Sequence, residues 1–260
     1  MRVLVVQHSS RRRRVLLRRG VWAGGEVLVT VGLVLLLLVA HQLWWTNRQA
    51  REGAERKVEA LEREWERGAS EGEGGGGGQG GDSGMAAAPS PTEVPRRQPA
   101  AKRATSAAPD WSRAYAILTI PRLGLRVPVA EGTSKQNVLN KGYVGHYRGT
   151  QQPGRAGNFA LAGHRNTHGE PFRYVNRLGK GDEVEVETED ASYTYVVDRT
   201  LPETSARDGG VIRPVPRSGV RPGYGYSEPG YYLTLTTCTP EYTSKYRLVV
   251  WGKLVSMRPR

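Results

Sequence analysis

Residues 232–254, YLTLTTCTPEYTSKYRLVVWGKL, decide the fold because they hold two strand-like runs joined by a short polar connection. The first run, residues 232–237, alternates apolar and β-branched residues, a pattern typical of a strand. Pro240 has no amide hydrogen to give to a β-ladder, so it predicts the end of that strand. A second apolar run begins directly after Arg247. We therefore expect Cys238 and Arg247 to face each other across a tight connection.

Cys238 is the only cysteine among the 260 residues, so the chain forms no intramolecular disulfide. By itself, a single cysteine is more often a small buried hydrophobic residue than a reactive thiol. It becomes a nucleophile where a neighbouring cation favours the thiolate. Two candidate neighbours are Arg247 and His164, which follows an apolar run at residues 157–163. Taken alone, each has an ordinary explanation, because a lone histidine is usually structural and an arginine is usually a solvated charge.

The N-terminal part has the pattern of a membrane anchor. Residues 1–20 contain seven arginines and no acidic residue, and the nearly apolar run that follows predicts a transmembrane helix over residues 21–45. That run is long enough to cross a bilayer core of ~30 Å. Tryptophans stand near both of its ends, as in an interfacial aromatic belt: Trp22, Trp44 and Trp45. Because basic segments stay in the cytoplasm, the remainder of the chain is expected outside the cell.

A cleaved signal peptide is the competing interpretation of this segment. Its apolar region would be shorter and would end in a small-x-small cleavage site. Here the apolar run ends in the sequence HQLWW, which fits such a site poorly. We therefore expect a retained anchor, in a single-pass type II protein of the cell membrane with an extracellular C-terminal domain.

Two segments of different composition separate the anchor from the globular part. Residues 46–68 carry glutamates and arginines three or four apart, which predicts a charged, solvated helical stem supported by ion pairs. Its apolar residues are few (Val58, Leu61 and Trp65), so a coiled coil is only weakly indicated. Residues 69–110 are rich in glycine, serine, alanine and proline, which predicts a disordered linker that holds the domain off the membrane.

Residues 111–260 form the globular part, where many short strand-like runs and almost no helix predict an all-β barrel or sandwich. The expected strands include residues 114–120, 125–129, 183–187 and 193–197. Short helical pieces are expected at residues 134–139, with Ser134 as the N-cap, and at residues 171–178. A loop rich in proline, glycine and arginine, residues 202–229, precedes the cysteine strand. Loops this long inside compact domains are usually functional.

The net charge of +13 limits the choice of partners. Residues 111–260 contain 21 basic and 13 acidic side chains, which would be attracted to anionic surfaces such as a cell wall or lipid headgroups. The simpler interpretation is a solvated basic surface. Nucleic acid is not expected as a partner, because the basic residues are scattered rather than arranged in a stripe with stacking aromatics.

Two motifs together resemble the signatures of a known enzyme family. The run Thr-Leu-Thr-Thr-Cys at residues 234–238, followed by Pro240 and by Arg247 before Leu-Val-Val, resembles the cysteine signature of sortases. Sortases are membrane-anchored cysteine transpeptidases of Gram-positive bacteria. The sequence LAGHR at residues 161–165 resembles the histidine motif of the same family. The resemblance covers residues 114–254, and the order and spacing of the motifs make it specific.

This resemblance implies the eight-stranded closed β-barrel of the family and a role for each motif residue. Cys238 would attack the threonine carbonyl of a C-terminal sorting signal and form a thioester. His164 would protonate the departing glycine amine and then help to deprotonate the incoming amine. Arg247 would hydrogen-bond the substrate and stabilise the oxyanion. Thr237 and Tyr147 are the candidate substrate contacts, and no cofactor or metal is expected.

The resemblance also implies substrates and partners. The donors would be surface proteins with a sorting signal of the Leu-Ala-x-Thr-Gly or Leu-Pro-x-Thr-Gly type, cleaved between Thr and Gly. The acceptor would be a peptidoglycan amine, on a precursor or a lipid-linked form. The sequence GYVGHY at residues 142–147 is similar to class E, the housekeeping-type sortases of high-GC actinobacteria, which prefer alanine in the signal. The chain departs from that class at Thr239, at Glu241-Tyr242 and across residues 202–225, which leaves the preferred signal open.

Three alternatives to this function stay open. The first is a class C-like sortase that polymerises pilins, and the second is a hydrolytic cysteine peptidase that releases surface proteins. The third is a non-enzymatic wall-binding module on a stalk. Formation of an amide with an added amine separates a transpeptidase from a peptidase, and loss of function in Cys238→Ala separates an enzyme from a binding module.

Three further motifs have simpler explanations. His168 follows His164 by four residues, the spacing of metal ligands on a helix, but flanking glycines favour a loop and no partners are spaced for zinc. The acidic run at residues 182–190 resembles calcium sites of some sortases, yet its period-two spacing indicates an exposed strand face. The sequence LPETS at residues 201–205 nearly spells a sorting signal but ends in serine. We interpret it as chance, with self-cleavage as the alternative.

Overall fold

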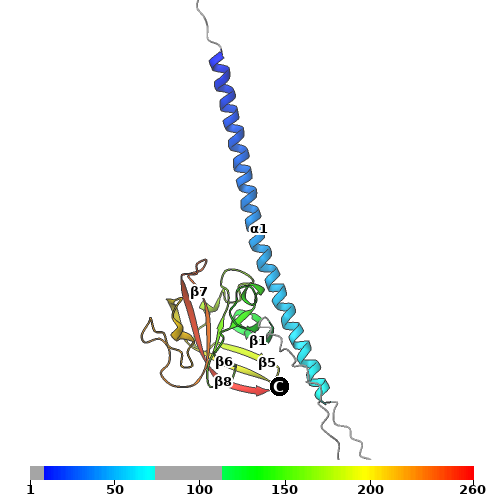
Figure 1. The fold of residues 1–260 in the computed structure, drawn as a ribbon, viewed down its shortest axis with the longest axis vertical. Coiled ribbons are helices and arrows are strands. Elements are labelled where there is room, and N and C mark those ends of the chain that lie inside the picture. Colours follow the sequence, from blue (N-terminus) through cyan, green and yellow to red (C-terminus); the bar gives the residue numbers. More distant parts are fainter. Residues whose placement is uncertain (1–8, 74–112) are drawn as a thin grey trace, which may run out of the picture.

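The structure of the protein is a computed structural model that describes residues 9–73 and 113–260. Most of the expected disordered linker, at residues 74–110, lies outside the described residues, as do the first eight residues of the expected cytoplasmic segment. The described chain consists of one long helix and a β-domain (Figure 1).

Eight strands close into a barrel in the order β1-β2-β3-β4-β7-β8-β6-β5, which confirms the expected fold class. The strands are β1 (Ala114–Ile120), β2 (Leu125–Glu131), β3 (Val144–His146), β4 (Gly157–Ala162), β5 (Glu183–Thr188), β6 (Ala191–Ser205), β7 (Tyr231–Thr239) and β8 (Tyr246–Pro259). Short 3-10 helices lie between them: η1 (Pro121–Leu123), η2 (Leu139–Lys141), η3 (Val175–Arg177) and η4 (Gly209–Ile212). Most neighbouring strands are antiparallel, but β2 pairs with β3 and β4 pairs with β7 in parallel.

The barrel interior is filled by alternate residues of the strands. On β1, Leu118 and Ile120 are fully buried in a cluster that includes Leu233 and Leu235 of β7 and Val250 of β8. Burying each such side chain contributes about 1.5–3 kcal/mol. The other face of β7 and β8 has a second apolar cluster, in which Leu201, Tyr232, Val249 and Trp251 pack against Val211 and Tyr226 of the segment between β6 and β7. Strand β7 is therefore covered on both faces.

Two expected elements differ in detail. The helix expected at residues 171–178 is a series of turns followed by η3. Strand β6 continues to Ser205, beyond the expected start of the long loop at residue 202. The register of β6 against β8 shifts between Leu201 and Thr204, and such a bulge accommodates Pro202, which has no amide hydrogen for the ladder. The LPETS sequence is therefore part of a paired strand.

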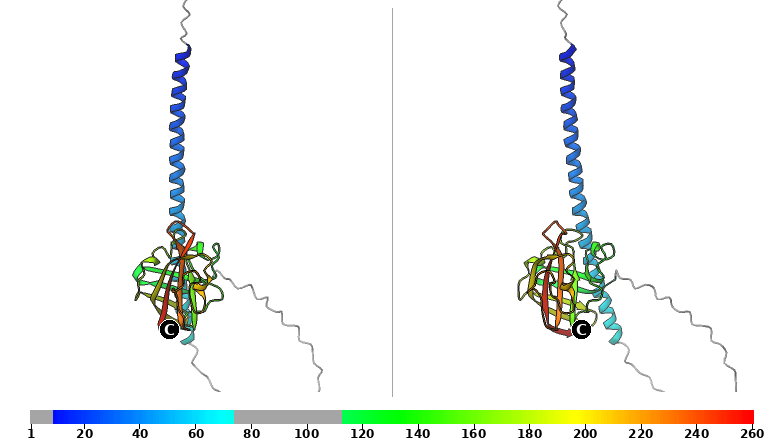
Figure 2. Two further views of the ribbon diagram at one scale, coloured as in Figure 1. Left: turned by 90° about the vertical axis from the view of Figure 1, so that its left-hand side faces the viewer. Right: turned by 60° about the vertical axis from the view of Figure 1, so that its left-hand side comes forward.

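Helix α1 (Ser9–Glu73) is one continuous helix whose C-terminal part lies along the barrel (Figures 1 and 2). Val58, Leu61 and Trp65 pack against Ile117 and Val138 of the barrel domain. The structure thus differs from the expected solvated stem. The buried positions recur every three or four residues and form one narrow stripe on the helix: Ala50, Ala54, Val58, Leu61 and Trp65. The alanines in this stripe give little apolar signal in the sequence.

Residues 21–45 of α1 are exposed and mostly apolar. The described part of the chain has one helix long and apolar enough to cross a membrane, with a mean hydropathy of 2.3 in its most apolar window. None of that window is buried against the protein. The helix therefore fits a membrane anchor or a signal sequence.

Leu118→Ala is expected to lower the free energy of unfolding by about 2–5 kcal/mol, because Leu118 is fully buried at the centre of β1 and its loss leaves a cavity. Denaturant unfolding of the variant and of the unaltered protein measures the difference. Val255→Ala is the matched control, since the Val255 side chain is 60% exposed and its loss is expected to change stability by less than about 0.5 kcal/mol. Equal effects of the two substitutions would contradict this assignment of the core.

Candidate active site

Strands β7 and β8 bring Cys238 and Arg247 together. The two residues are direct partners in the antiparallel register of these strands. Opposed residues in such a ladder have Cα atoms about 4.5–5.5 Å apart. Both side chains are partly buried, at the end of β7 and the start of β8. The register is the one expected from the sequence, because it sets the two residues opposite each other across a short connection.

Strand β4 adds His164 at the same end of the barrel. The parallel pairing of β4 with β7 sets Ala162 beside Thr236. Past the end of β4, Gly163 N donates a hydrogen bond to Thr236 O at 3.1 Å. Thr237 Oγ1 donates in turn to Gly163 O at 2.8 Å. Because parallel strands run in the same direction, the chain that follows places His164 next to the end of β7 that carries Cys238.

His164 lies in a partly buried environment. Its Nε2 is 2.9 Å from Asn140 Oδ1, and since a carbonyl oxygen only accepts, Nε2 carries the hydrogen. Its ring stacks on that of His168, with centroids 5.4 Å apart. Burial, together with the charges of His168 and Lys135, lowers the pKa of His164 to about 4. At neutral pH the imidazole is therefore uncharged, with Nδ1 as the available base.

Arg165 ties the histidine loop to the cysteine strand. Its buried guanidinium donates through Nη1 to Cys238 O at 3.2 Å and to Thr239 Oγ1 at 3.0 Å. In the sequence Arg165 is only one residue of the LAGHR motif, with no expected role of its own. Its place directly after His164 was the only signal, because nothing local indicates that it reaches the backbone of a residue 73 positions away.

A cavity of about 140 Å³ lies beside Arg247 and is lined by Tyr147, Thr236 and the start of the segment between β6 and β7. Tyr147 Oη lies 3.0 Å from Thr236 Oγ1. The guanidinium of Arg247 donates through Nη1 to Ser244 O and to Tyr246 O, each at 2.9 Å. Because residues two apart on a strand share a face, Cys238 lies on the same face of β7 as Thr236. The cavity is therefore a candidate substrate site on the cysteine side of β7.

The two candidate substrate contacts are placed differently. Tyr147 lines the cavity, and its contact with a substrate stays a prediction. Thr237 was expected to face the cleft, but it lies on the same face of β7 as Leu235 in the core and is 3% exposed. The hydroxyl of Thr237 donates a hydrogen bond to Gly163 O. This contact holds the residue after β4 against β7. Strand alternation gives Thr236 the place beside the cavity instead, and a substrate contact of Thr237 stays a prediction.

Asp208 organises the wall of this cavity. Thr204 Oγ1 donates to its carboxylate at 2.6 Å, Ser218 Oγ donates to the same oxygen, and Gly219 N donates at 3.0 Å. Burial raises the pKa of Asp208, but the hydrogen bonds from Ser218, Thr204 and backbone amides outweigh it and hold the pKa below its usual value. A charged Asp208 therefore ties the end of β6 to the middle of the segment that follows it, a role that the sequence did not indicate.

Metal ligands are not gathered anywhere in the described side chains. Residues 18–70 and 113–260 contain no group of three or more His, Cys, Asp or Glu side chains that could hold a metal ion. His168 stacks on His164 in a loop rather than on a helix. Glu183, Glu185 and Glu187 of the acidic run lie on β5, where Val184 and Val186 alternate with them and fill the core.

A closed barrel that gathers a thiol, an imidazole and a guanidinium at one end has the layout of a cysteine-dependent enzyme. The sortase domain model matches residues 118–255. Sortase SrtE1 of Streptomyces coelicolor is 41% identical over 241 residues, which are 91% of this chain and 57% of the relative. Sortase SrtE2 of the same organism is 33% identical, over 89% of this chain and 80% of the relative.

A solved structure agrees with these relatives. The crystal structure of sortase E1 from Streptomyces coelicolor with a tripeptide in the active site has a TM-score of 0.54 and 52% sequence identity, and the match covers 57% of this chain and 92% of that one. This chain therefore belongs to the sortase family of cysteine transpeptidases, with class E sortases among its relatives. It spans little more than half the length of SrtE1.

The stability of the protein is expected to fall as the pH is lowered from about 6.5 to 4. In this range the unfolded state binds protons on its histidines, whereas the folded state keeps His164 neutral, so stability rises with pH. Burial also lowers the pKa of His146 and His168, which adds to the same slope. Denaturant unfolding at a series of pH values measures the slope.

The variant His164→Asn is expected to show a shallower slope over the same pH range, because one of the groups that titrates differently in the two states is gone. A slope as steep as that of the unaltered protein would contradict the low pKa of His164.

Proposed function

We propose that this chain is a membrane-anchored sortase that cleaves a C-terminal sorting signal between Thr and Gly and transfers the acyl group to a peptidoglycan amine. The observation that supports it most directly is the register of β7 against β8, which sets Cys238 opposite Arg247 at the barrel end that also carries His164. The sortase relatives, one of them solved with a tripeptide in its active site, support the same conclusion.

The first step forms a thioester on Cys238. The neutral imidazole of His164 accepts the thiol proton as sulfur bonds to the threonine carbonyl carbon. The carbonyl oxygen gains negative charge in the tetrahedral intermediate, and the guanidinium of Arg247 stabilises it. When the carbonyl reforms, the C–N bond to glycine breaks, and His164 gives its proton to the departing amine. The signal is left as an acyl group on sulfur.

The second step transfers the acyl group to an acceptor amine. The neutral His164 takes a proton from the incoming amine while the amine nitrogen attacks the thioester carbon. The C–S bond then breaks, and the proton returns to the Cys238 sulfur. The lowered pKa leaves His164 in its proton-accepting form at neutral pH, and it also makes the imidazole a weaker base than an ordinary histidine.

The donor would be a surface protein whose signal has the Leu-Ala-x-Thr-Gly or Leu-Pro-x-Thr-Gly pattern, with alanine favoured in line with the class E resemblance. The acceptor would be a peptidoglycan precursor or a lipid-linked amine. The apolar part of α1 supports a type II anchor that places the barrel outside the cell. No cofactor is assigned to this reaction.

Paired peptides test the signal and the reaction class. The full chain in detergent or in nanodiscs is incubated with peptides that differ only in Ala or Pro at the second position, with and without an added amine. The proposal expects an amide product with the amine and faster turnover of the alanine peptide. Release of free acid alone, whatever the amine concentration, would identify a hydrolytic peptidase instead.

Cys238→Ala is expected to abolish turnover, because no other residue supplies the acyl-accepting sulfur. Arg247→Lys is expected to lose about 10²–10³-fold in kcat, because an ammonium lacks the planar fork of donors that stabilises the oxyanion. The matched control is Arg258→Lys, an exposed position on the same strand. Product formation measured by mass spectrometry distinguishes these cases.

Near-normal turnover in Arg247→Lys would remove Arg247 from the oxyanion role. An amide product formed by Cys238→Ala would contradict the thioester mechanism altogether.

A further inference from the structure

Glu170 links α1 to the loop that carries His164. Its carboxylate accepts hydrogen bonds from two residues of α1, Asn47 Nδ2 at 2.9 Å and Arg51 Nη2 at 3.1 Å. Arg173 Nη1 donates to the same carboxylate at 2.7 Å. The Glu170 side chain is 5% exposed, and a carboxylate so deeply buried is stable only with such donors around it.

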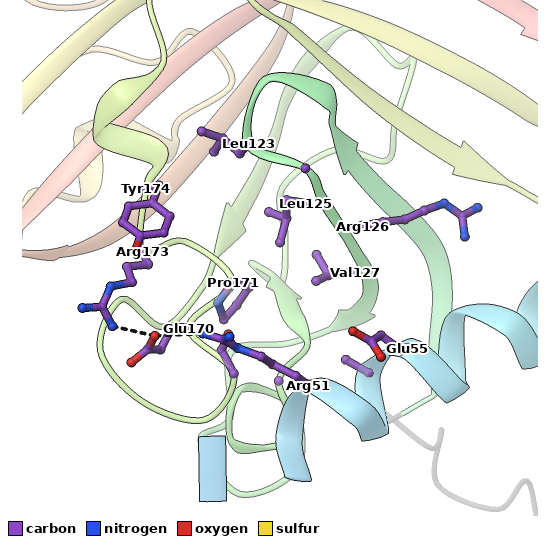
Figure 3. A pocket seen from close by; sticks show the side chains of 14 residues that line it. Arg51, Glu55, Leu123, Leu125, Arg126, Val127, Glu170, Pro171, Arg173 and Tyr174 are labelled. Carbon is purple, nitrogen blue, oxygen red and sulfur yellow. Dashed lines mark hydrogen bonds and ion pairs between the residues drawn. The ribbon is translucent and has the colours of Figure 1, made fainter. Parts of the chain in front are cut away.

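Arg173 extends this link to the connection that follows Cys238. Its Nη2 lies 2.8 Å from Glu241 Oε1 and donates to Tyr242 Oη at 3.0 Å. Figure 3 shows Arg173 and Glu170 joined on one side of a cavity of about 260 Å³ between α1 and the barrel, with Arg51 beside them. A continuous set of polar contacts therefore runs from α1 through Glu170 to the segment between β7 and β8.

The loop between His164 and Glu170 has an unusual backbone. Three consecutive residues have positive φ: His168 at 52°, Gly169 at 83° and Glu170 at 53°. This conformation is unfavourable for residues other than glycine and persists where surrounding contacts hold it. Helix α1 provides such contacts, since Gly169 N donates to Asn47 Oδ1 at 3.3 Å and Arg51 Nε donates to Gly169 O at 3.1 Å.

The strained segment adjoins the catalytic histidine directly. The His168 ring stacks on His164, and Phe172 N closes the loop by donating to His164 O at 3.0 Å. A shift of the backbone at residues 168–170 would therefore move the side chain against which His164 packs. Displacements of about 1 Å at reacting groups can lower rates about a hundredfold.

We propose that Glu170 is a positioning residue, and that Asn47 and Arg51 of α1 complete the active site by holding the His164 loop and the β7–β8 connection through it. Glu170 touches no reacting atom and acts through His168 and Arg173. The proposal rests on the proposed function, because it concerns the placement of the same thiol and imidazole. It adds that the anchor helix is part of the catalytic framework.

The polar contacts are separable from the attachment of the helix. Further along α1, Val58, Leu61 and Trp65 bury an apolar stripe against the barrel. Removing the donors at Asn47 and Arg51 should lower stability, because the buried Glu170 carboxylate keeps only Arg173 as a charged donor. The apolar stripe should stay docked, because its contacts with Ile117 and Val138 do not involve Glu170. The variants should therefore stay folded while the loops become mobile.

The test compares variants of the full chain in nanodiscs. The double variant Asn47→Ala/Arg51→Ala is expected to lower kcat about tenfold to a hundredfold with KM nearly unchanged. Arg51→Lys should retain more activity than Arg51→Ala, because it keeps a positive charge beside Glu170. The matched control is Arg48→Ala, which removes an exposed arginine of α1 that pairs only within the helix, with Glu52.

Amide hydrogen exchange gives a second readout that does not depend on turnover. Exchange in residues 164–170 and 241–245 should become faster in the double variant, while the apolar stripe of α1 and the barrel strands keep their protection. If the unaltered protein has no transpeptidase activity, the proposed function fails, yet this measurement still decides whether α1 holds the loops.

Two results would overturn the proposal. Unchanged kcat in the double variant would show that the contacts of α1 do not position the site. A loss of activity that only follows a lower melting temperature, with equal kcat per folded molecule, would show that they merely stabilise the fold.

Discussion

The parallel pairing of β4 with β7 is the constraint on which the site depends. Parallel strands end on the same side of a sheet, so the residues after Ala162 and after Thr237 are brought to one barrel end although they are far apart in sequence. An antiparallel partner for β7 at this position would have placed the histidine loop at the opposite end. The antiparallel pairing of β7 with β8 then adds Arg247 through a local connection. One parallel and one antiparallel ladder therefore define the site together.

The two faces of β7 have different tasks. Leu233 and Leu235 fill the barrel interior, whereas Tyr232 and Thr236 face the segment between β6 and β7. Cys238 belongs to the second face by alternation. Because that face is covered by a segment rather than by another sheet, a thiol there can meet a substrate without opening the core. Asp208 fixes the start of the covering segment and so shapes the cavity beside Arg247.

Local sequence was sufficient for the features that depend on neighbouring residues. The end of β7, the start of β8 and the meeting of Cys238 with Arg247 follow from alternation, Pro240 and a short connection. The closed barrel was predicted only through the family resemblance, because closure depends on pairings between distant strands. Residues that act across such distances, Arg165 among them, gave no signal, since their partners cannot be identified from spacing. Thr237 rather than Thr236 was expected as the substrate contact. Alternation shows that the two residues lie on opposite faces of the strand, but it does not show which face is the inner one.

The buried face of the charged stem could not be predicted from the sequence. Its first two buried residues, Ala50 and Ala54, are small, so the segment has the composition of a solvated helix. The stem runs from one end of the barrel to the other. Asn47 contacts Gly169 at the end that carries His164, and Trp65 lies beneath the guanidinium of Arg260 at the opposite end. Eighteen residues of helix separate these contacts, about 27 Å. The apolar segment ends only two residues before Asn47. With that segment in a bilayer, the barrel end that carries His164 and Cys238 would lie nearer the lipid surface than the end that carries Arg260, so any molecule that reaches the thiol would do so close to the membrane.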